Sequence, residues 1–106
     1  MPKYLIQASY SKEGLQGLLK EGGSSRRDAV RSLVEGMGGT LDTFLFAFGD
    51  RDLYVIADMP NQESMAALAL TAGASGAGSI HTTVLLTPEE IDAAANKTVN
   101  YRPPGK

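Results

Sequence analysis

The chain has 106 residues, ten of them basic and twelve acidic, so its net charge at pH 7 is −2. A net charge so close to zero does not indicate binding to a nucleic acid or to a membrane surface, both of which require clustered basic residues. The sequence contains no cysteine, which excludes a disulfide framework, a thiol nucleophile and a zinc site built on thiolates. No apolar run approaches the roughly 20 residues that span a bilayer. These features predict one soluble, cytoplasmic domain comprising residues 1–106.

The N-terminal residues predict a strand followed by a weak helix. Residues Lys3–Tyr10 alternate between two sets of side chains and are rich in aromatic and aliphatic types, a pattern typical of a strand. Because this strand begins at Lys3, no secretory signal is expected. Ser11–Lys20 carries leucines at helical spacing. Gly14 and Gly17 each weaken a helix by roughly 1 kcal/mol relative to alanine, so only a short helical turn is predicted there.

The main first helix is predicted to start at Ser25. This serine is followed three residues later by Asp28, which resembles a capping box, in which the serine oxygen accepts a hydrogen bond from a helix N–H group. Gly38 and Gly39 are suited to end the helix about three turns later with a left-handed residue. One apolar stripe at helical spacing lies in between, formed by Val30, Leu33, Val34 and Met37.

The middle of the chain predicts a hairpin and a second long helix. Thr40–Phe48 and Leu53–Met59 are strand-like runs, and the residues Gly49–Asp52 between them predict a hairpin turn. Pro60 ends the second strand, and Asn61 is suited to cap a helix. That helix carries apolar residues at helical spacing, namely Met65, Leu68, Ala69 and Ala72.

The C-terminal third predicts a last strand, a capped helix and an extended tail. Ser79–Leu86 is dense in β-branched residues and follows a glycine-rich segment. Thr87, Pro88 and Glu90 occupy the N-cap, first-turn and third positions of a last helix, and each residue type suits its place. Lys97–Lys106 contains two prolines and is expected to be extended.

This order of elements predicts an α+β domain of the ferredoxin-like type. A strand, a helix, two hairpin strands, a helix and a strand form two right-handed β-α-β crossovers around a hairpin. The expected architecture is a βαββαβ sandwich, in which a four-stranded antiparallel sheet carries both long helices on one side and a further helix follows at the C-terminus. No repeat at solenoid spacing and no linker is visible, so no domain boundary is predicted.

The two faces of the predicted sheet are expected to differ. An even number of residues in the hairpin turn places three pairs opposite one another, Phe48–Leu53, Phe46–Val55 and Phe44–Ala57. These pairs join other apolar residues in a helix-side core, namely Ile6, Ala8, Ile80, Val84 and Leu86. The opposite face, left bare by the helices, is expected to hold Leu5, Gln7, Ser9, Thr43, Leu45, Ala47, Tyr54, Ile56, Asp58, His81, Thr83 and Leu85.

The composition of the bare face is typical of neither a solvated surface nor a core. A solvated surface would carry lysine, glutamate and arginine in place of Leu45 and Ile56, and a core would exclude Gln7, Asp58 and His81. Exposed apolar area of this kind marks a partner site. A second copy of the chain is the simplest partner, because a two-fold interface needs only one self-complementary patch.

The chain resembles the GYD-domain proteins, a group of small bacterial and archaeal proteins named for a Gly-Tyr-Asp hallmark at the hairpin. The matching stretches are Gly38–Gly39, Phe48–Gly49 with Asp52, Pro60 and Gly76. Two positions depart from the pattern, because Arg51 stands where the hallmark tyrosine is expected and Asn61 where an aspartate commonly follows the proline. The resemblance implies a ferredoxin-like fold related to the dimeric α+β barrels, and it implies no substrate or cofactor.

A pocket is predicted on the bare face around His81, the single histidine of the chain. An imidazole with a reference pKa near 6.5 serves as acid, base or metal ligand. A lone histidine cannot build the multi-histidine sites that zinc or non-haem iron prefer, so a structural or interface role is favoured, with no metal and no cofactor. The residues expected to line the pocket, in which a carboxylate would raise the pKa of the histidine, are His81, Tyr54, Asp58, Gln7, Thr83 and Leu45.

Three functions are compatible with such a pocket. The favoured one is binding of a small organic molecule, or a regulatory role, in a cleft between the sheet and a second subunit of a homodimer or higher homo-oligomer. One alternative is a cofactor-independent enzyme of the isomerase or monooxygenase type, with His81 or Tyr54 as acid or base. The other alternative is a purely structural assembly module.

Two further segments are interpreted as structural. Gly22–Arg27 could hold an anion at a helix start, but it lacks the spacing and the lysine of a phosphate-binding loop, so a loop with a capped helix is favoured. Asp50 and Asp52 flank Arg51 in the hairpin turn, where acidic residues serve local hydrogen bonding. Two carboxylates without further oxygen ligands make a poor calcium site.

Overall fold

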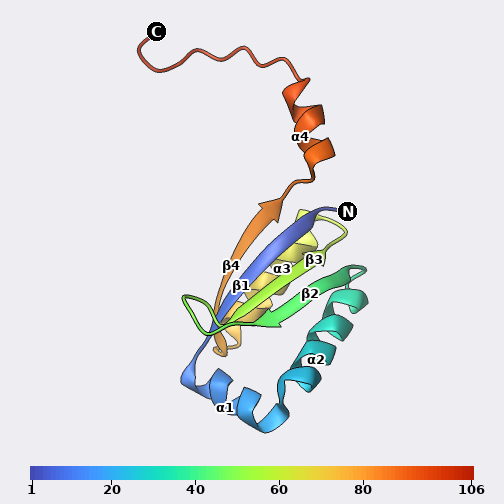
Figure 1. Cartoon of the computed structure of the whole chain (residues 1–106), viewed down its shortest axis with the longest axis vertical. Helices are drawn as coiled ribbons and strands as arrows, with labels where there is room; N and C mark the ends of the chain where they lie inside the picture. Colours follow the sequence, from blue (N-terminus) through green and yellow to red (C-terminus); the bar gives the residue numbers. More distant parts are fainter.

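Four strands and four helices make up the computed structural model, which describes residues 1–106 (Figure 1). Along the chain they are β1 (Lys3–Tyr10), α1 (Lys12–Glu21), α2 (Gly23–Gly36), β2 (Thr40–Phe46), β3 (Leu53–Asp58), α3 (Gln62–Ala74), β4 (Gly78–Leu85) and α4 (Pro88–Ala95). The strands pair antiparallel in the order β2-β3-β1-β4. This order is that of a ferredoxin-like sheet, so the predicted α+β class, the four-stranded antiparallel sheet and the extra C-terminal helix are confirmed.

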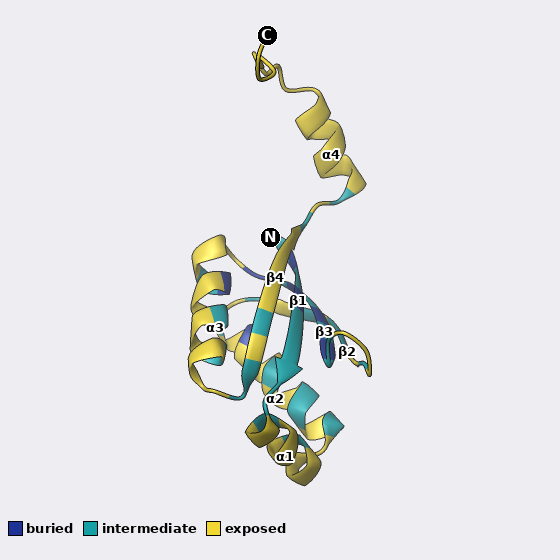
Figure 2. Ribbon diagram, turned by 90° about the vertical axis from the view of Figure 1, so that its left-hand side faces the viewer, coloured by how far each residue is buried: buried dark blue, intermediate teal, exposed yellow.

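One face of the sheet carries the core beneath α2 and α3. Successive side chains of a strand point to opposite sides, so alternate residues of β1 and β3 meet the helices. α2 packs against β2 and α3 against β4, the two edge strands, and Figure 2 shows α3 exposed on its outer side and buried where it meets the sheet. Only eight of the 106 residues are buried, which makes the core thin; they are Tyr4, Ile6, Val34, Leu53, Val55, Ala57, Met59 and Met65.

The helical region before β2 differs from the prediction. Ser11 caps α1, and its hydroxyl oxygen accepts a hydrogen bond from the Gly14 N–H group at 3.1 Å. α2 begins at Gly23, so the predicted capping box at Ser25 is wrong. The reason is Gly22, whose φ of 88° lies in the left-handed region that favours glycine. This residue separates α1 from α2, and Ser25 falls inside the first turn of α2.

Three predicted helix boundaries are confirmed. Gly38, just after α2, has a left-handed φ of 87°. Asn61 caps α3 by accepting a hydrogen bond from the Ser64 N–H group at 2.8 Å. Thr87 and Glu90 form a reciprocal capping box at α4, with hydrogen bonds of 3.1 and 2.9 Å. The hydrogen bonds from the backbone and side chain of Thr87 lower the pKa of Glu90.

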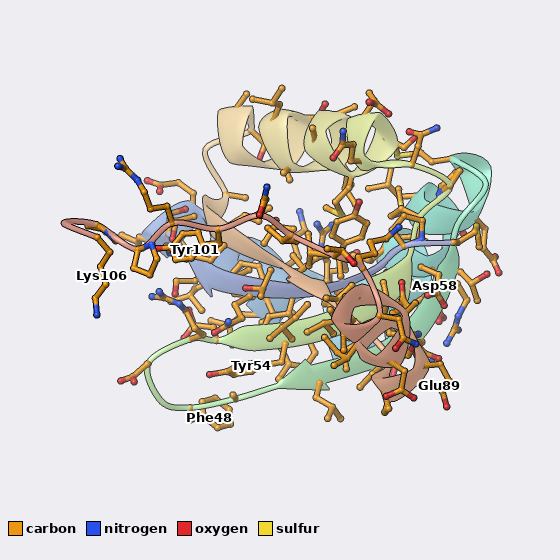
Figure 3. The ribbon with its side chains drawn as sticks, turned by 90° about the horizontal axis from the view of Figure 1, so that it is seen from above. Phe48, Tyr54, Asp58, Glu89, Tyr101 and Lys106 are labelled. Atoms are coloured by element: carbon orange, nitrogen blue, oxygen red, sulfur yellow. The ribbon has the colours of Figure 1, made fainter.

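The central hairpin pairs two residues away from the predicted register. Phe46 lies opposite Leu53, and β2 ends there. Phe48 is 104% exposed on the connecting loop, so its predicted place in the helix-side core is wrong (Figure 3). A shift of two residues leaves the predicted side chains that remain in β2 and β3 on their faces, because the side-chain period of a strand is two. Ala47, predicted on the bare face, lies beyond the end of β2, so its predicted placement is wrong as well.

Contacts of the hairpin loop with β1 explain this shift. The Ala47 N–H group donates to the Asp52 carbonyl at 2.9 Å, and the Asp52 N–H group donates to the Ala8 carbonyl at 2.9 Å. These bonds close a loop longer than the predicted four-residue turn. At the far edge of the sheet, Val84 and Leu86 also stay exposed, at 61% and 56%. They lie at and beyond the end of the edge strand β4, where no helix covers them, so their predicted core placement is wrong.

α4 and the tail lead away from the sheet and its two helices (Figures 1 and 2). Every residue from Pro88 to Lys106 is exposed, including the apolar side chains of Ile91, Val99 and Tyr101. The arm raises the radius of gyration to 16.9 Å, against about 13 Å for a compact domain of this length. None of the helices is both long and apolar enough to cross a membrane.

The two glycines inside α1 provide a matched test of how this helix is held. A Cβ atom at Gly14 would collide with the Ala77 carbonyl, the oxygen that accepts a hydrogen bond from the Ser11 N–H group at 2.8 Å. A Cβ atom at Gly17 would meet nothing within 4 Å. We expect Gly14→Ala to lower the free energy of unfolding by about 1–3 kcal/mol through overpacking. Gly17→Ala is expected to raise it by about 0.5–1 kcal/mol.

Urea denaturation of both variants and the wild type measures these changes. Stabilisation by both substitutions would show that α1 does not pack at Gly14 against the Ala77 carbonyl, in the segment before β4.

Candidate functional site

Four of the six predicted pocket residues form a single row across the uncovered face of the sheet. Gln7 pairs with Tyr54 on one side and with His81 on the other, and Tyr54 pairs with Leu45. Strands lie about 4.8 Å apart, so the backbones of Tyr54 and His81, two strands apart, are separated by about 10 Å. The row therefore places an amide between a phenol and an imidazole, on a face with no helix above it.

The other two predicted pocket residues lie farther along the strands. Thr83 belongs to the next row, beside Leu5. Asp58 lies four residues from Tyr54 along β3, about 13 Å away at the rise of a strand, and Figure 3 shows the two residues towards opposite ends of β3. The structure therefore does not bring the Asp58 carboxylate to His81, although the sequence placed both on one face.

Asp58 instead belongs to a small charged cluster at the end of the sheet. The Lys3 ammonium lies 2.9 Å from an Asp42 carboxylate oxygen and 3.1 Å from one of Asp58. Two hydrogen bonds raise the pKa of the Lys3 ammonium; the bond to Asp42 has the larger effect and the bond to Asp58 the smaller. Asp42 reaches this cluster because the register of β2 and β3 shifts between Leu41 and Thr43, an irregularity that sequence parity does not reveal.

We call the uncovered side of the sheet the open face; the register assigns to it Lys3, Leu5, Gln7, Ser9, Thr40, Thr43, Leu45, Tyr54, Ile56, Asp58, Ser79, His81, Thr83 and Leu85. Leu45 is 61% exposed there, His81 is exposed, and Gln7 and Tyr54 are half-buried. The four apolar side chains of the open face, Leu5, Leu45, Ile56 and Leu85, are thus interspersed with polar ones, and the face is open to solvent in the single chain.

A cavity of about 340 Å³ lies on the opposite side of the sheet, between α2 and α3. We call it the helix-side cavity. α2 and α3 pack against the two edge strands, so the helices are far apart over the centre of the sheet. The side chains of α3 that border the gap include Ala67, Ala69 and Ala72, which are too short to fill it. Its walls are mostly apolar, with Val30, Leu33, Leu68 and Ile80 among them.

One polar pair lines the helix-side cavity at the end of β1. The Tyr10 hydroxyl is buried and has no partner at ordinary hydrogen-bond geometry. Burial raises the pKa of Tyr10, whereas the charge of the neighbouring Arg26 guanidinium and a weak hydrogen bond from it lower that pKa. Both residues also border a second cavity of about 460 Å³. This polar cavity, which contains Glu13 and Glu21, adjoins the apolar one at the pair.

Sequence reasoning did not single out Tyr10 or Arg26. A signal was present for Tyr10, because its position in the strand alternation places a phenol on the face that the helices cover. Arg26 belongs to the segment Gly22–Arg27, for which the sequence allows an anion site at a helix start but favours a structural loop; the structure places Arg26 in the first turn of α2.

Asp52 fixes the position of Tyr10. Its side-chain carboxylate accepts a hydrogen bond from the Tyr10 N–H group at 2.8 Å, and its own N–H group donates to the Ala8 carbonyl. The Asp52 side chain therefore forms a hydrogen bond, as predicted for the acidic turn residues, but with β1 and not within the turn. No group of three or more histidine, aspartate or glutamate side chains could hold a metal ion.

The family model described as GYD domain matches residues 4–95, a span from β1 to α4 that includes Asp52 and Tyr10. Neither the curated proteins nor the solved structures give a match.

Substitution of the two aspartates in the hairpin loop tests which of them stabilises the fold. Asp52→Ala removes the charged acceptor of the Tyr10 N–H group, and hydrogen bonds to charged groups contribute about 1.5–3 kcal/mol, so we expect a loss of stability of that size. Asp50→Ala, at an exposed loop position, is expected to change stability by less than about 0.5 kcal/mol. Thermal and urea unfolding measure both changes. Equally small losses of stability in the two variants would contradict a stabilising contact between Asp52 and β1.

Proposed function

The chain belongs to the GYD-domain family, and from this premise we propose that it is a small-molecule-binding protein that pairs with a second copy of itself. The helix-side cavity carries the proposal. Natural cores contain few voids larger than a water molecule, whereas ligand sites are mostly apolar cavities of about 300–1,000 Å³ with a few polar groups. A cavity of about 340 Å³ with one polar pair fits the second description.

Self-association is supported by the surface that the single chain leaves exposed. The accessible area is 7294 Å², about 1,600 Å² more than the roughly 5,700 Å² expected for a compact protein of this mass. The projecting arm accounts for part of this excess, and the open face with Leu45 contributes apolar area to it. A standard interface removes about 800 Å² from each partner, so the excess is large enough for a second copy on the open face.

Binding is favoured over catalysis by the positions of the titratable groups on the open face. An acid or base must come within about 3 Å of the proton that it transfers. Tyr54 and His81 are separated by two strand spacings with Gln7 between them. The Asp58 carboxylate, which would have activated His81, pairs with Lys3.

A neutral fluorophore tests the binding function. N-phenyl-1-naphthylamine should bind the wild-type protein in the helix-side cavity with enhanced fluorescence. Ala69→Leu adds three carbon atoms at the cavity wall, and overfilling costs about 1–3 kcal/mol, so we expect affinity to fall roughly tenfold or more. Ala66→Leu is the matched control, because Ala66 is exposed on the same helix. Equal affinity in all three proteins would place the probe elsewhere, and no binding to the wild type would contradict the proposal.

A charge on the open face tests self-association. We expect the wild type to scatter light as a particle larger than 11.2 kDa at micromolar concentration. Leu45→Lys should shift it to the monomer without unfolding it, because burying an ammonium at an apolar interface is unfavourable and the helix-side core is untouched. Leu70→Lys introduces the same charge at a leucine of α3 that is 74% exposed, and it should leave the oligomer intact. A monomeric wild type, or equal effects of the two substitutions, would contradict the pairing.

A further inference from the structure

We propose that the ligand of the helix-side cavity is a small organic monoacid, with its apolar body between α2 and α3 and its carboxylate at the Tyr10 hydroxyl and the Arg26 guanidinium. The inference rests on the proposed function, since it names the chemical class of the molecule that this cavity holds.

The Tyr10 hydroxyl marks where the head group lies. It is the one buried side-chain polar atom of the chain without a partner at ordinary hydrogen-bond geometry. Most buried polar atoms have such a partner, and an orphaned one is destabilising. The neighbouring Arg26 guanidinium can only donate, so the chain offers no acceptor for the phenol proton, and an oxygen atom of a ligand would supply one. Desolvation raises the pKa of Tyr10, which keeps the hydroxyl protonated as a donor.

The positive charge of Arg26 indicates that the head group is an anion. It is the one cationic side chain that borders either cavity. The neighbouring arginines are already used, since Arg27 and Arg31 lie 3.2 and 3.5 Å from Asp28, whereas Arg26 has no carboxylate within ion-pair distance. A guanidinium presents a planar set of donors that matches a carboxylate.

The surroundings limit the charge of the ligand to one. Glu13 and Glu21 border the polar cavity next to the Tyr10–Arg26 pair, and Glu21 is close enough for its charge to raise the pKa of Tyr10. The two carboxylates repel any anionic head, and their repulsion of a dianion such as a phosphate monoester is about twice their repulsion of a monoanion. A carboxylate, with one negative charge, is neutralised by Arg26 alone.

The apolar part of the cavity sets the size of the body. An apolar cavity of about 150 Å³ holds benzene in another protein, and the helix-side cavity is about 340 Å³. Its room suits an alkyl chain of medium length or a bicyclic aromatic body. Aliphatic walls from Val30, Leu68 and Ile80 provide no polar group along the body, so recognition is confined to the head.

Competition against N-phenyl-1-naphthylamine tests the inference with three probes that share one chain, octanoate, octan-1-ol and octyl phosphate. We expect octanoate to displace the fluorophore about tenfold more tightly than octan-1-ol, because charge-assisted hydrogen bonds are the strong ones. Octyl phosphate at pH 8 should be weaker than octanoate.

Three substitutions assign the effect to residues. Arg26→Gln should weaken octanoate about tenfold and leave octan-1-ol unchanged, and Tyr10→Phe should weaken octanoate at least several-fold. Arg27→Gln is the matched control, because Arg27 borders neither cavity, and it should leave octanoate binding unchanged. Circular dichroism verifies that each variant folds, and the comparison of the three probes on the wild type remains decisive if one does not.

The outcomes separate the inference from the function on which it rests. Equal affinity for octanoate and octan-1-ol, or octanoate binding insensitive to Arg26→Gln, would overturn the monoacid assignment while the cavity still binds the fluorophore. Tighter binding of octyl phosphate than of octanoate would overturn the limit to one charge. Absence of any fluorophore binding, or binding insensitive to Ala69→Leu, would instead contradict the binding function of the cavity itself.

Discussion

The contact between Asp52 and the end of β1 is the constraint on which the rest of the structure depends. Its carboxylate and backbone hold Tyr10 and Ala8, which ties the hairpin loop to the central strand. Because Asp52 is held there, β2 pairs with β3 up to Phe46, and Phe48 is left on the loop. The same contact positions the Tyr10 ring over the helix side of the sheet. One acidic residue thus sets the hairpin register and the polar end of the cavity.

The second determinant is where the two long helices lie on the sheet. Each packs against an edge strand, and the inner side of α3 is largely alanine. Small residues let α3 approach β4 closely but leave the centre of the sheet uncovered. The thin core and the helix-side cavity therefore have one cause. A bound molecule in the cavity and a second copy on the open face would each bury apolar surface that the isolated chain leaves exposed.

Local chemistry explains why much of the fold was predictable. Strand alternation assigns Tyr54, His81 and Leu45 to one face in both the predicted and the observed register, because the two differ by two residues, which preserves the side. The capping groups of Asn61 and Thr87 act within three residues of the chain, so their residue types suffice to place the starts of α3 and α4. The start of α2 was misplaced because Ser25 also suits a cap, and only the conformation of Gly22 decides between them.

The sequence by itself determined the α+β class, the order of the strands and helices, and the composition of the two faces of the sheet, because these follow from periodicity and short-range hydrogen bonds. Only the tertiary structure decided which residues share a site. It separated Asp58 from His81 by pairing the carboxylate with Lys3, and it brought Arg26 of α2 to the cavity that Tyr10 of β1 also borders. Those outcomes depend on the register of β1 and β3, which places Lys3 opposite Asp58, and on the spacing of α2 and α3. Both arise from packing between segments far apart in the chain, which no local pattern encodes.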